Sequence, residues 1–233
     1  EMVDFLNYYS KGVYLERDVE LIINGDMFDL LAVPYVRYFD DEFWSEKASL
    51  EKLQLIFKAH KEVMNALSQF VRGESKSITF IIGNHDAEFM LPSLQQEFYR
   101  VFREQDRNKV KIRLNIDKPY EPVPGVVLKH GHEYEFAHRF SPQHSVFENE
   151  EGKRYFLPPW GSYYVTRIIN KFKAERYYVN AVRPIRKFLI NGLIYDTLFT
   201  LRFMFSNAFY FIMVRFLYTF KQGKKWREIM QAI

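Results

Sequence analysis

The feature that most constrains the fold of this chain is a strand-like run that ends in glycine and ligand-type side chains. The clearest copy is 77–82, a β-branched and aromatic run followed at once by Gly-Asn-His-Asp at 83–86. Two further copies, each a run with its polar end, are 19–23 with 24–29 and 125–129 with 130–133. Because ligands bind at the carboxyl ends of strands in α/β sheets, we expect three parallel strands whose ends meet at one point.

The side chains at positions 84–86 offer three different kinds of chemistry. Asn84 carries a neutral carbonyl oxygen, His85 an imidazole that titrates near neutral pH, and Asp86 a carboxylate that can fix a histidine tautomer. The alternative is a simple polar turn, because Asn and Asp also favour turns. The repetition of the pattern favours a ligand site.

Three short motifs at these strand ends resemble a known family. Gly-Asp-Met-Phe-Asp at 25–29, Gly-Asn-His-Asp at 83–86 and His-Gly-His at 130–132 look like the second, third and fourth motifs of the calcineurin-like metallophosphoesterases. The resemblance implies an α/β fold, a layered β-sandwich flanked by helices. The family's first motif, Asp-x-His, and its last, Gly-His-x-His, are not among the 233 residues, and we expect them in flanking sequence of a longer protein.

The resemblance also implies roles for five residues. Asp26, Asn84 and His130 would be metal ligands at a site for two divalent ions, with Asp26 as the bridging carboxylate. Oxygen and imidazole donors suit manganese, iron or zinc. His85, hydrogen-bonded to Asp86, would stabilise or protonate the leaving oxygen while a metal-bound hydroxide attacks in line.

Three neighbouring residues are assigned less narrowly. Asp29 is expected either to orient a ligand or to serve in a turn. His132 is expected to support the metal ligands or to contact substrate, since the first histidine of the tripeptide is the usual ligand in the family. His138 lies in the polar loop that follows and could face the cleft, although an exposed histidine is the simpler expectation.

The order of predicted elements divides the chain into three parts. Residues 1–150 alternate strand and helix patterns and are expected to form the catalytic core, with a right-handed βαβ connection. One helix is predicted across 50–71, where apolar residues recur at steps of three and four. We expect 151–222 to be a helical insert or lid, and 223–233 to be a helix that returns to the core.

The most unusual stretch is 188–220, which is rich in Phe and aliphatic residues. Asp196, Arg202 and Arg215 interrupt it too often for a membrane-spanning helix. One explanation is a pair of helices buried against the core or in a homodimer. The other is peripheral contact with a membrane, because basic residues flank the stretch on both sides.

Composition adds limits to these expectations. The sequence has no cysteine, which excludes disulfides and thiolate metal sites. This fits a cytoplasmic protein, which would be peripheral to the membrane if residues 188–220 contact the lipid surface. The net charge of +4, from 33 basic and 29 acidic residues, is only a slight preference for anionic partners. The sequence contains no recognisable platform of aromatic and basic residues on which bases could stack, so nothing in it points to nucleic acid as the partner.

The function expected from these observations is a metal-dependent phosphoesterase that hydrolyses a phosphate ester or pyrophosphate bond. Its substrate would be a phosphorylated small molecule, a nucleotide diphosphate or a lipid-linked compound. Family members that cleave the pyrophosphate of a UDP-linked acylated sugar have a similar Gly-Asp-x-Phe-Asp motif. The alternatives are a nuclease and a non-catalytic, membrane-associated or interaction module on a degenerate phosphoesterase fold.

Overall fold

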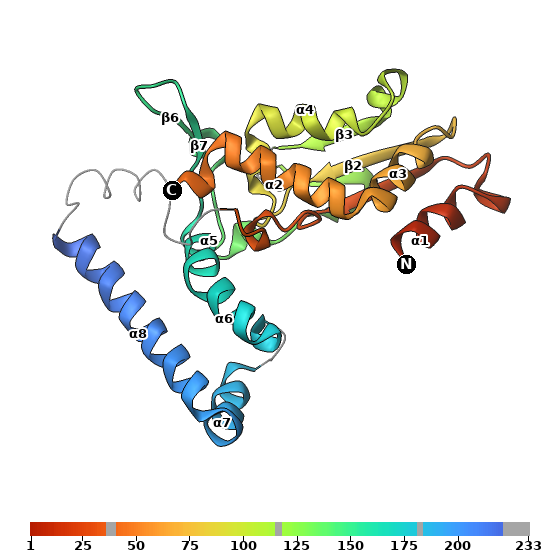
Figure 1. The fold of residues 1–233 in the computed structure, drawn as a ribbon. Helices are drawn as coiled ribbons and strands as arrows, with labels where there is room; N and C mark the ends of the chain where they lie inside the picture. The colour runs from red at the N-terminus through yellow and green to blue at the C-terminus, as the bar shows by residue number, and fades with distance from the viewer. Residues whose placement is uncertain (36–40, 115–117, 181–183, 221–233) are drawn as a thin grey trace. The chain divides into compact units, whose positions relative to one another are not determined.

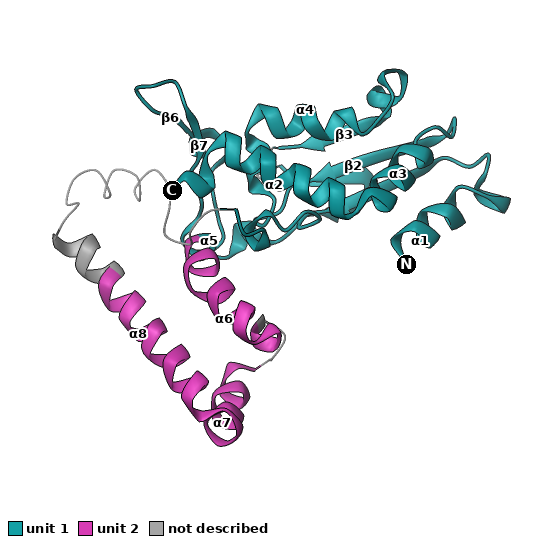
Figure 2. Cartoon of the chain, viewed as in Figure 1, with its two compact units in different colours: residues 1–162 teal, residues 163–233 magenta. Residues whose placement is uncertain are grey.

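The chain has a mixed α/β fold with two compact units. The computed structural model describes residues 1–35, 41–114, 118–180 and 184–220. The first unit comprises residues 1–162 and the second 163–233 (Figure 2). The helix expected at 223–233 lies outside the described residues.

A three-stranded parallel sheet forms the centre of the first unit (Figure 1). Its strands are β1 (Val19–Asn24), β2 (Lys76–Ile81) and β3 (Val110–Arg113), in that order. The predicted parallel pairing of the first two strands is confirmed, with Asn24 opposite Ile81 in the register. The carboxyl ends of β1 and β2 are therefore neighbours at one edge of the sheet.

Helices connect the parallel strands. α2 (Glu46–Ala59) and α3 (Lys61–Phe70) lie between β1 and β2 in sequence, and α4 (Pro92–Arg100) lies between β2 and β3. Both crossovers run the same way across the sheet, so right-handed connections place these helices on one face, where α2 contacts α4. A shorter helix, α1 (Met2–Tyr9), precedes the sheet and contacts α3.

The prediction of one continuous helix across 50–71 is wrong, because the structure has two separate helices there, α2 and α3. The break is at His60, whose φ of −113° and ψ of 36° leave the helical region. Its carbonyl accepts the N–H groups of Val63 and Met64, so backbone hydrogen bonding continues into α3. No Gly or Pro marks this bend, and the apolar period therefore runs through it unchanged.

Two antiparallel pairs complete the described strands. β4 (Tyr120–Val123) pairs with β5 (Val126–Leu128), and β6 (Val146–Glu148) pairs with β7 (Arg154–Phe156). The prediction that 125–129 is a third parallel strand is therefore wrong. Only two residues separate β4 from β5, and a connection this short joins antiparallel neighbours. β3 is the third parallel strand instead.

An aromatic cluster anchors the end of the sheet where β1 and β2 terminate. It consists of Phe28, Phe80, Phe89 and Phe98, each at most 3% exposed. Phe28 stacks on Phe89 with ring centroids 5.3 Å apart, and its ring centroid lies 5.5 Å from that of Phe80. Burial of such rings stabilises a fold by about 2 kcal/mol or more each. The loops after β1 and β2 are thus each held down by a buried phenylalanine.

The second unit is helical over its described residues. Its elements are the end of α5 (Trp160–Tyr164), a π-helical turn (Val165–Ile169), α6 (Asn170–Glu175), a 3-10 turn (Tyr177–Asn180), α7 (Ile185–Tyr195) and α8 (Thr197–Phe220). Its core is largely aromatic and includes Phe172, Phe188, Phe199, Phe203 and Tyr210. In the part of the chain that the structure describes, no helix has the length and apolar character needed to cross a membrane.

Candidate functional site at the ends of β1 and β2

The loops that follow β1 and β2 are interlocked through Asp26. The backbone N–H of His85 donates a hydrogen bond of 2.9 Å to Asp26 Oδ1. Gly83 lies so close to the same side chain that a methyl group at position 83 would overlap Asp26 Oδ1. The motif at 25–29 and the motif at 83–86 therefore meet in space, because they follow strands that are neighbours in the sheet.

His130 reaches the same place from the segment after β5. Its Nδ1 lies 2.6 Å from the carbonyl oxygen of Asn24, so Nδ1 carries the hydrogen and donates it. Its Nε2 faces Asp26 Oδ2 at 3.2 Å. Gly25 leaves room for this approach, since a methyl group there would overlap the imidazole ring. The predicted neighbours Asp26 and His130 are in contact although β5 belongs to a separate sheet.

The loop after β1 holds two aspartates in an uncommon backbone conformation. Asp26 has a φ of 56° and Asp29 a φ of 36°, and Gly25 before them has a φ of 81°. Left-handed conformations in residues other than glycine cost about 1 kcal/mol or more and concentrate at functional sites. The strain turns both carboxylates toward the loop that carries His85.

Asp29 is the partner of the His85 imidazole. Asp29 Oδ1 lies 2.6 Å from His85 Nδ1, and a carboxylate can only accept, so Nδ1 donates. The predicted hydrogen bond between His85 and Asp86 is wrong. Asp86 instead accepts the backbone N–H of Gly83 and, at 2.9 Å, that of Met27. Asp86 therefore ties the two loops together, while Asp29 fixes the histidine.

Electrostatics within the site couple the carboxylates and the histidines. Burial raises the pKa of Asp26, but hydrogen bonds from the His130 side chain and the His85 backbone outweigh it and leave this pKa lowered. The hydrogen bond to Asp26 raises the pKa of His130 to about 9. Burial lowers the pKa of His85, but Asp29 and the charges of Asp26 and Asp86 leave it raised. Both histidines are thus stabilised in the protonated form.

Asp86 is the most buried carboxyl group of the site, with no exposed surface. Burial raises its pKa to about 7, although hydrogen bonds from Gly83 and Met27 lower it. This carboxyl group has no contact with bulk water, and its oxygens are used by backbone N–H groups. Asp86 therefore acts within the scaffold of the loops rather than on a ligand.

Asn84 and two histidines form the remaining part of the site. Asn84 is 7% exposed, and its amide nitrogen lies 3.5 Å from His138 Nδ1. The polar sequence around His138 favours an exposed loop, whereas the structure places this ring against Asn84, the alternative in which it faces the cleft. His132 is 4% exposed and stacks on Phe140 with ring planes 3° apart. Burial lowers the pKa of His132 to about 4, so this ring is neutral.

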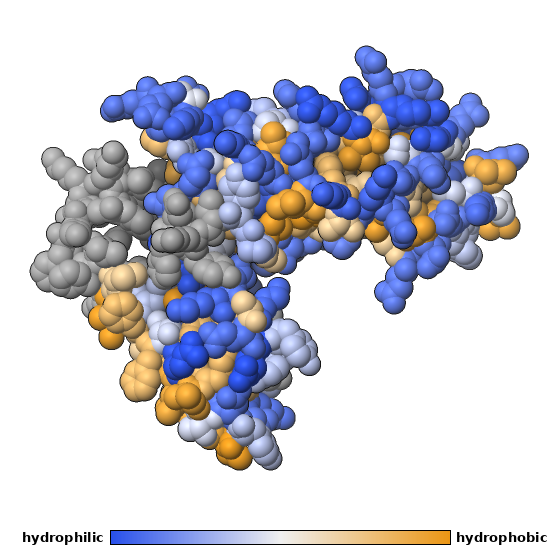
Figure 3. Space-filling view, in the orientation of Figure 1, coloured by the Kyte–Doolittle hydropathy of each residue, from blue (hydrophilic) through white to orange (hydrophobic). Residues whose placement is uncertain are grey.

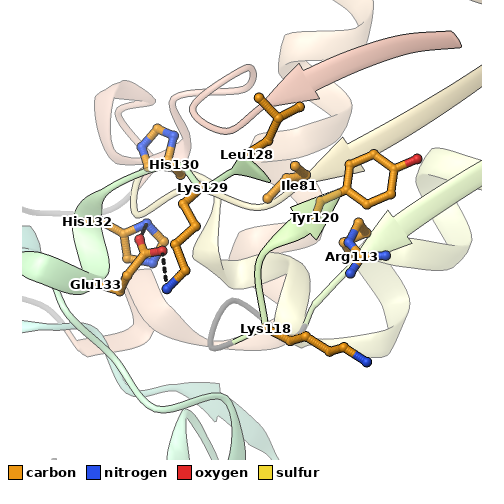
Figure 4. Close-up of a pocket in the computed structure, with 9 residues that line it drawn as sticks. All are labelled: Ile81, Arg113, Lys118, Tyr120, Leu128, Lys129, His130, His132 and Glu133. Carbon is orange, nitrogen blue, oxygen red and sulfur yellow. Dashed lines mark ion pairs between the residues drawn. The ribbon is translucent and has the colours of Figure 1, made fainter. Parts of the chain in front are cut away.

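A shallow pocket with a basic wall adjoins these residues (Figure 4). His130 and His132 line one part of it, and Arg113, Lys118 and Lys129 line another. The Arg113 guanidinium lies 4.5 Å from the centre of the Tyr120 ring, which holds it in place. Glu133 also lines the pocket and forms an ion pair of 3.4 Å with Lys129, so this wall combines three cations with one carboxylate.

The donors predicted to hold a metal are one carboxylate, one imidazole and one amide. Over the described ranges, no three His, Asp or Glu side chains group together in a way that could hold a metal ion. Comparison with protein-family models, with curated proteins and with solved structures found no match for this chain.

Proposed function

We propose that this chain is a divalent-metal-dependent phosphoesterase of the calcineurin-like type, with that family's layered β-sandwich, hydrolysing a phosphate ester or pyrophosphate bond. The observation that carries the proposal is the meeting of Asp26 with His130 and with the His85 loop. Asp26 lies 59 positions before His85 and 104 positions before His130 in the sequence, and the three converge beside strand ends, where α/β proteins bind ligands.

The donor types at the site are ones that a divalent cation accepts. Asp26, Asn84 and His130 would hold it through carboxylate, amide and imidazole donors, a set that suits manganese, iron or zinc. His130 Nδ1 donates its hydrogen to the backbone carbonyl of Asn24, so Nε2 is the ring nitrogen that would bind the cation. Nε2 faces Asp26, the other charged donor. Gly25 and Gly83 keep space next to both donors that any larger residue would fill.

Two divalent cations bound there would neutralise phosphoryl oxygens and lower the pKa of water from its bulk value toward about 7. The protein itself contributes a proton donor. Asp29 holds Nδ1 of His85, so Nε2 is the ring nitrogen that can donate to the leaving oxygen. The raised pKa of His85 keeps that proton in place near neutral pH. A donor positioned in this way contributes about 10²- to 10⁴-fold in rate.

Substrate orientation falls to the basic wall of the pocket. Arg113, Lys118 and Lys129 would attract the negative charge of a phosphorylated small molecule, a nucleotide diphosphate or the head of a lipid-linked substrate. Lys129 is tethered 3.4 Å from Glu133, which sets its position beside His130. This arrangement favours a compact anionic group at the site.

Hydrolysis of bis(4-nitrophenyl) phosphate tests the proposal. We expect activity with Mn²⁺ that is lost on chelation with EDTA and restored by adding Mn²⁺ back. Asp26→Ala should remove both metal binding and activity. Asp18→Ala changes an exposed aspartate just before β1 and should leave both intact. Activity that survives in the Asp26→Ala variant would contradict the proposal.

A further inference from the structure

The two units of the chain carry opposite charge. Residues 163–233 contain 13 Lys and Arg residues and 3 Asp and Glu residues, a formal charge of +10. Residues 1–162 contain 20 basic and 26 acidic residues, a formal charge of −6. Such asymmetry between parts of one chain indicates that the basic part meets an anionic partner. The modest net charge of the whole chain conceals this division.

The two acidic residues in the described part of the second unit are each paired with an arginine of the same unit. Glu175 is paired with Arg202, with the closest atoms 2.9 Å apart, and Asp196 with Arg176 at 2.7 Å. Both carboxylates are therefore occupied in internal ion pairs that hold the helices together. Arg186 and Lys187 at the start of α7 are exposed.

α8 carries two apolar stripes that have different surroundings. Phe199, Phe203 and Tyr210 are buried in the core of the unit. The second stripe is exposed and consists of Leu198, Leu201, Phe205, Phe209 and Ile212. Steps of three and four residues place these five side chains along one side of the helix. We call them the exposed stripe; Phe205 is 72% exposed and Phe209 68%.

α7 extends the apolar surface and adds positive charge to it. Ile190 is 53% exposed and Ile194 65%. Arg186 lies four residues before Ile190, so it shares a side of α7 with these two residues. Hydrophobic residues accordingly gather on the surface over α7 and α8 (Figure 3).

We infer that the exposed stripe of α8, with the basic start of α7, rests on an anionic lipid surface. An apolar helix face rimmed by Arg and Lys buries its side chains at the boundary between headgroups and acyl chains, while its cations meet the lipid phosphates. The helices would lie along the surface rather than cross it. A second copy of this chain bound stripe to stripe is a poorer occupant, because such a contact would place two units of charge +10 against each other.

Vesicle sedimentation of the full chain tests this inference. Vesicles of phosphatidylcholine alone are compared with vesicles that also contain phosphatidylglycerol, at low and at high salt. We expect binding to the anionic vesicles that weakens with salt. The double variant Phe205→Asp, Phe209→Asp should reduce binding by at least about tenfold. Leu55→Asp also replaces an exposed apolar residue by aspartate, but on α2, and this variant should bind as the unchanged chain does.

A second variant separates charge from apolar contact. Arg186→Glu with Lys187→Glu should lower binding to anionic vesicles by more than about tenfold and leave any binding to phosphatidylcholine alone unchanged. Circular dichroism verifies that each variant is folded, and we expect hydrolysis of the soluble ester to be unchanged in each, so that failure of this inference and failure of the proposed function are distinguishable. No sedimentation of the unchanged chain with anionic vesicles overturns the inference. Binding by the Phe205→Asp, Phe209→Asp variant that equals that of the unchanged chain also overturns it. A third contrary result is an unchanged chain that is a dimer and binds no vesicles, while the same variant is a monomer. Salt-sensitive binding to an oligonucleotide in place of vesicles would also overturn it.

Discussion

Asp29, rather than the adjacent Asp86, holds the imidazole of His85, with Asp29 Oδ1 2.6 Å from His85 Nδ1. The two residues come from the loops after β1 and β2, so the pair forms only when the strands are correctly aligned. It gives the candidate proton donor a fixed orientation and a raised pKa. The chemistry proposed for this site therefore depends on a contact between segments that are distant in sequence.

Substitution of His85 separates catalysis from metal binding. His85→Ala should retain metal, because the predicted ligands are Asp26, Asn84 and His130, but should lose about 10²- to 10⁴-fold in kcat. Metal analysis and ester hydrolysis on the same preparation measure both quantities. Turnover by this variant at the unchanged rate would remove the assignment of His85 as proton donor.

The Asp29→Asn variant tests the tuning of His85 by pH. Asp29 raises the pKa of His85, so its neutral replacement lowers that pKa. A donor works only while protonated, and activity that declines as pH rises should therefore begin to decline at lower pH in the variant. The pH profile of kcat measures this shift, with Asp18→Asn as the control. An unmoved profile would show that Asp29 has only a structural role.

Metal binding should release a proton from the site. The pKa of His130 is raised to about 9 by its hydrogen bond to Asp26, so this histidine is protonated at pH 7. A cation can bind Nε2 only after that proton leaves. At pH values below 9, affinity for Mn²⁺ should therefore increase about tenfold for each unit by which the pH is raised. Calorimetry in two buffers of different ionisation enthalpy counts the released protons. Affinity that does not change with pH would place His130 outside the metal site.

Gly83→Ala should disturb Asp26 without any change of charge. The added methyl group would overlap Asp26 Oδ1 and crowd the backbone nitrogen of Asp26, so the carboxylate must move. We expect at least about a tenfold loss of Mn²⁺ affinity, since displaced ligands bind less well. Gly125→Ala is the control for general destabilisation, because the φ of 81° strains an alanine there while the added methyl group meets nothing within 4 Å. Equal loss in both variants would point to general destabilisation.

A buried ion pair supports the segment that follows Gly-Asn-His-Asp at 83–86. Lys52 Nζ of α2 lies 3.1 Å from Glu88 Oε1, and both side chains are fully buried. Lys52→Met would leave Glu88 without its counter-charge and should cost roughly 3–5 kcal/mol of unfolding free energy. The double variant with Glu88→Gln should recover much of this loss. Denaturant unfolding measures it, with Lys58→Met on the exposed side of α2 as the control.

The fold was predictable where local pattern and strand order agree. The first two strand runs are continuous and β-branched, and the helical sequence between them makes them parallel neighbours, which brings Asp26 to the His85 loop. The run at 125–129 has a similar composition, but its two-residue connection to β4 forces an antiparallel pair. The bend at His60 has no sequence marker, because it contains neither Gly nor Pro.

Within the site, residue types could be predicted better than partners. The three strand-end motifs predict Asp26, Asn84, His85 and His130 as site residues, and the structure brings Asp26 into contact with His130 and with the backbone of His85. The choice between Asp29 and Asp86 depends on left-handed backbone at Asp29, which aspartate seldom adopts and sequence does not reveal. The contact of His138 with Asn84 likewise depends on how a polar loop returns to the sheet edge.

The most direct test of the central proposal is anomalous scattering from crystals grown with Mn²⁺. The account predicts an anomalous peak about 2 Å from donor atoms of Asp26, Asn84 and His130 together. Crystals that show no peak there, or in which the Asn84 side chain faces away from Asp26 and His130, would contradict it.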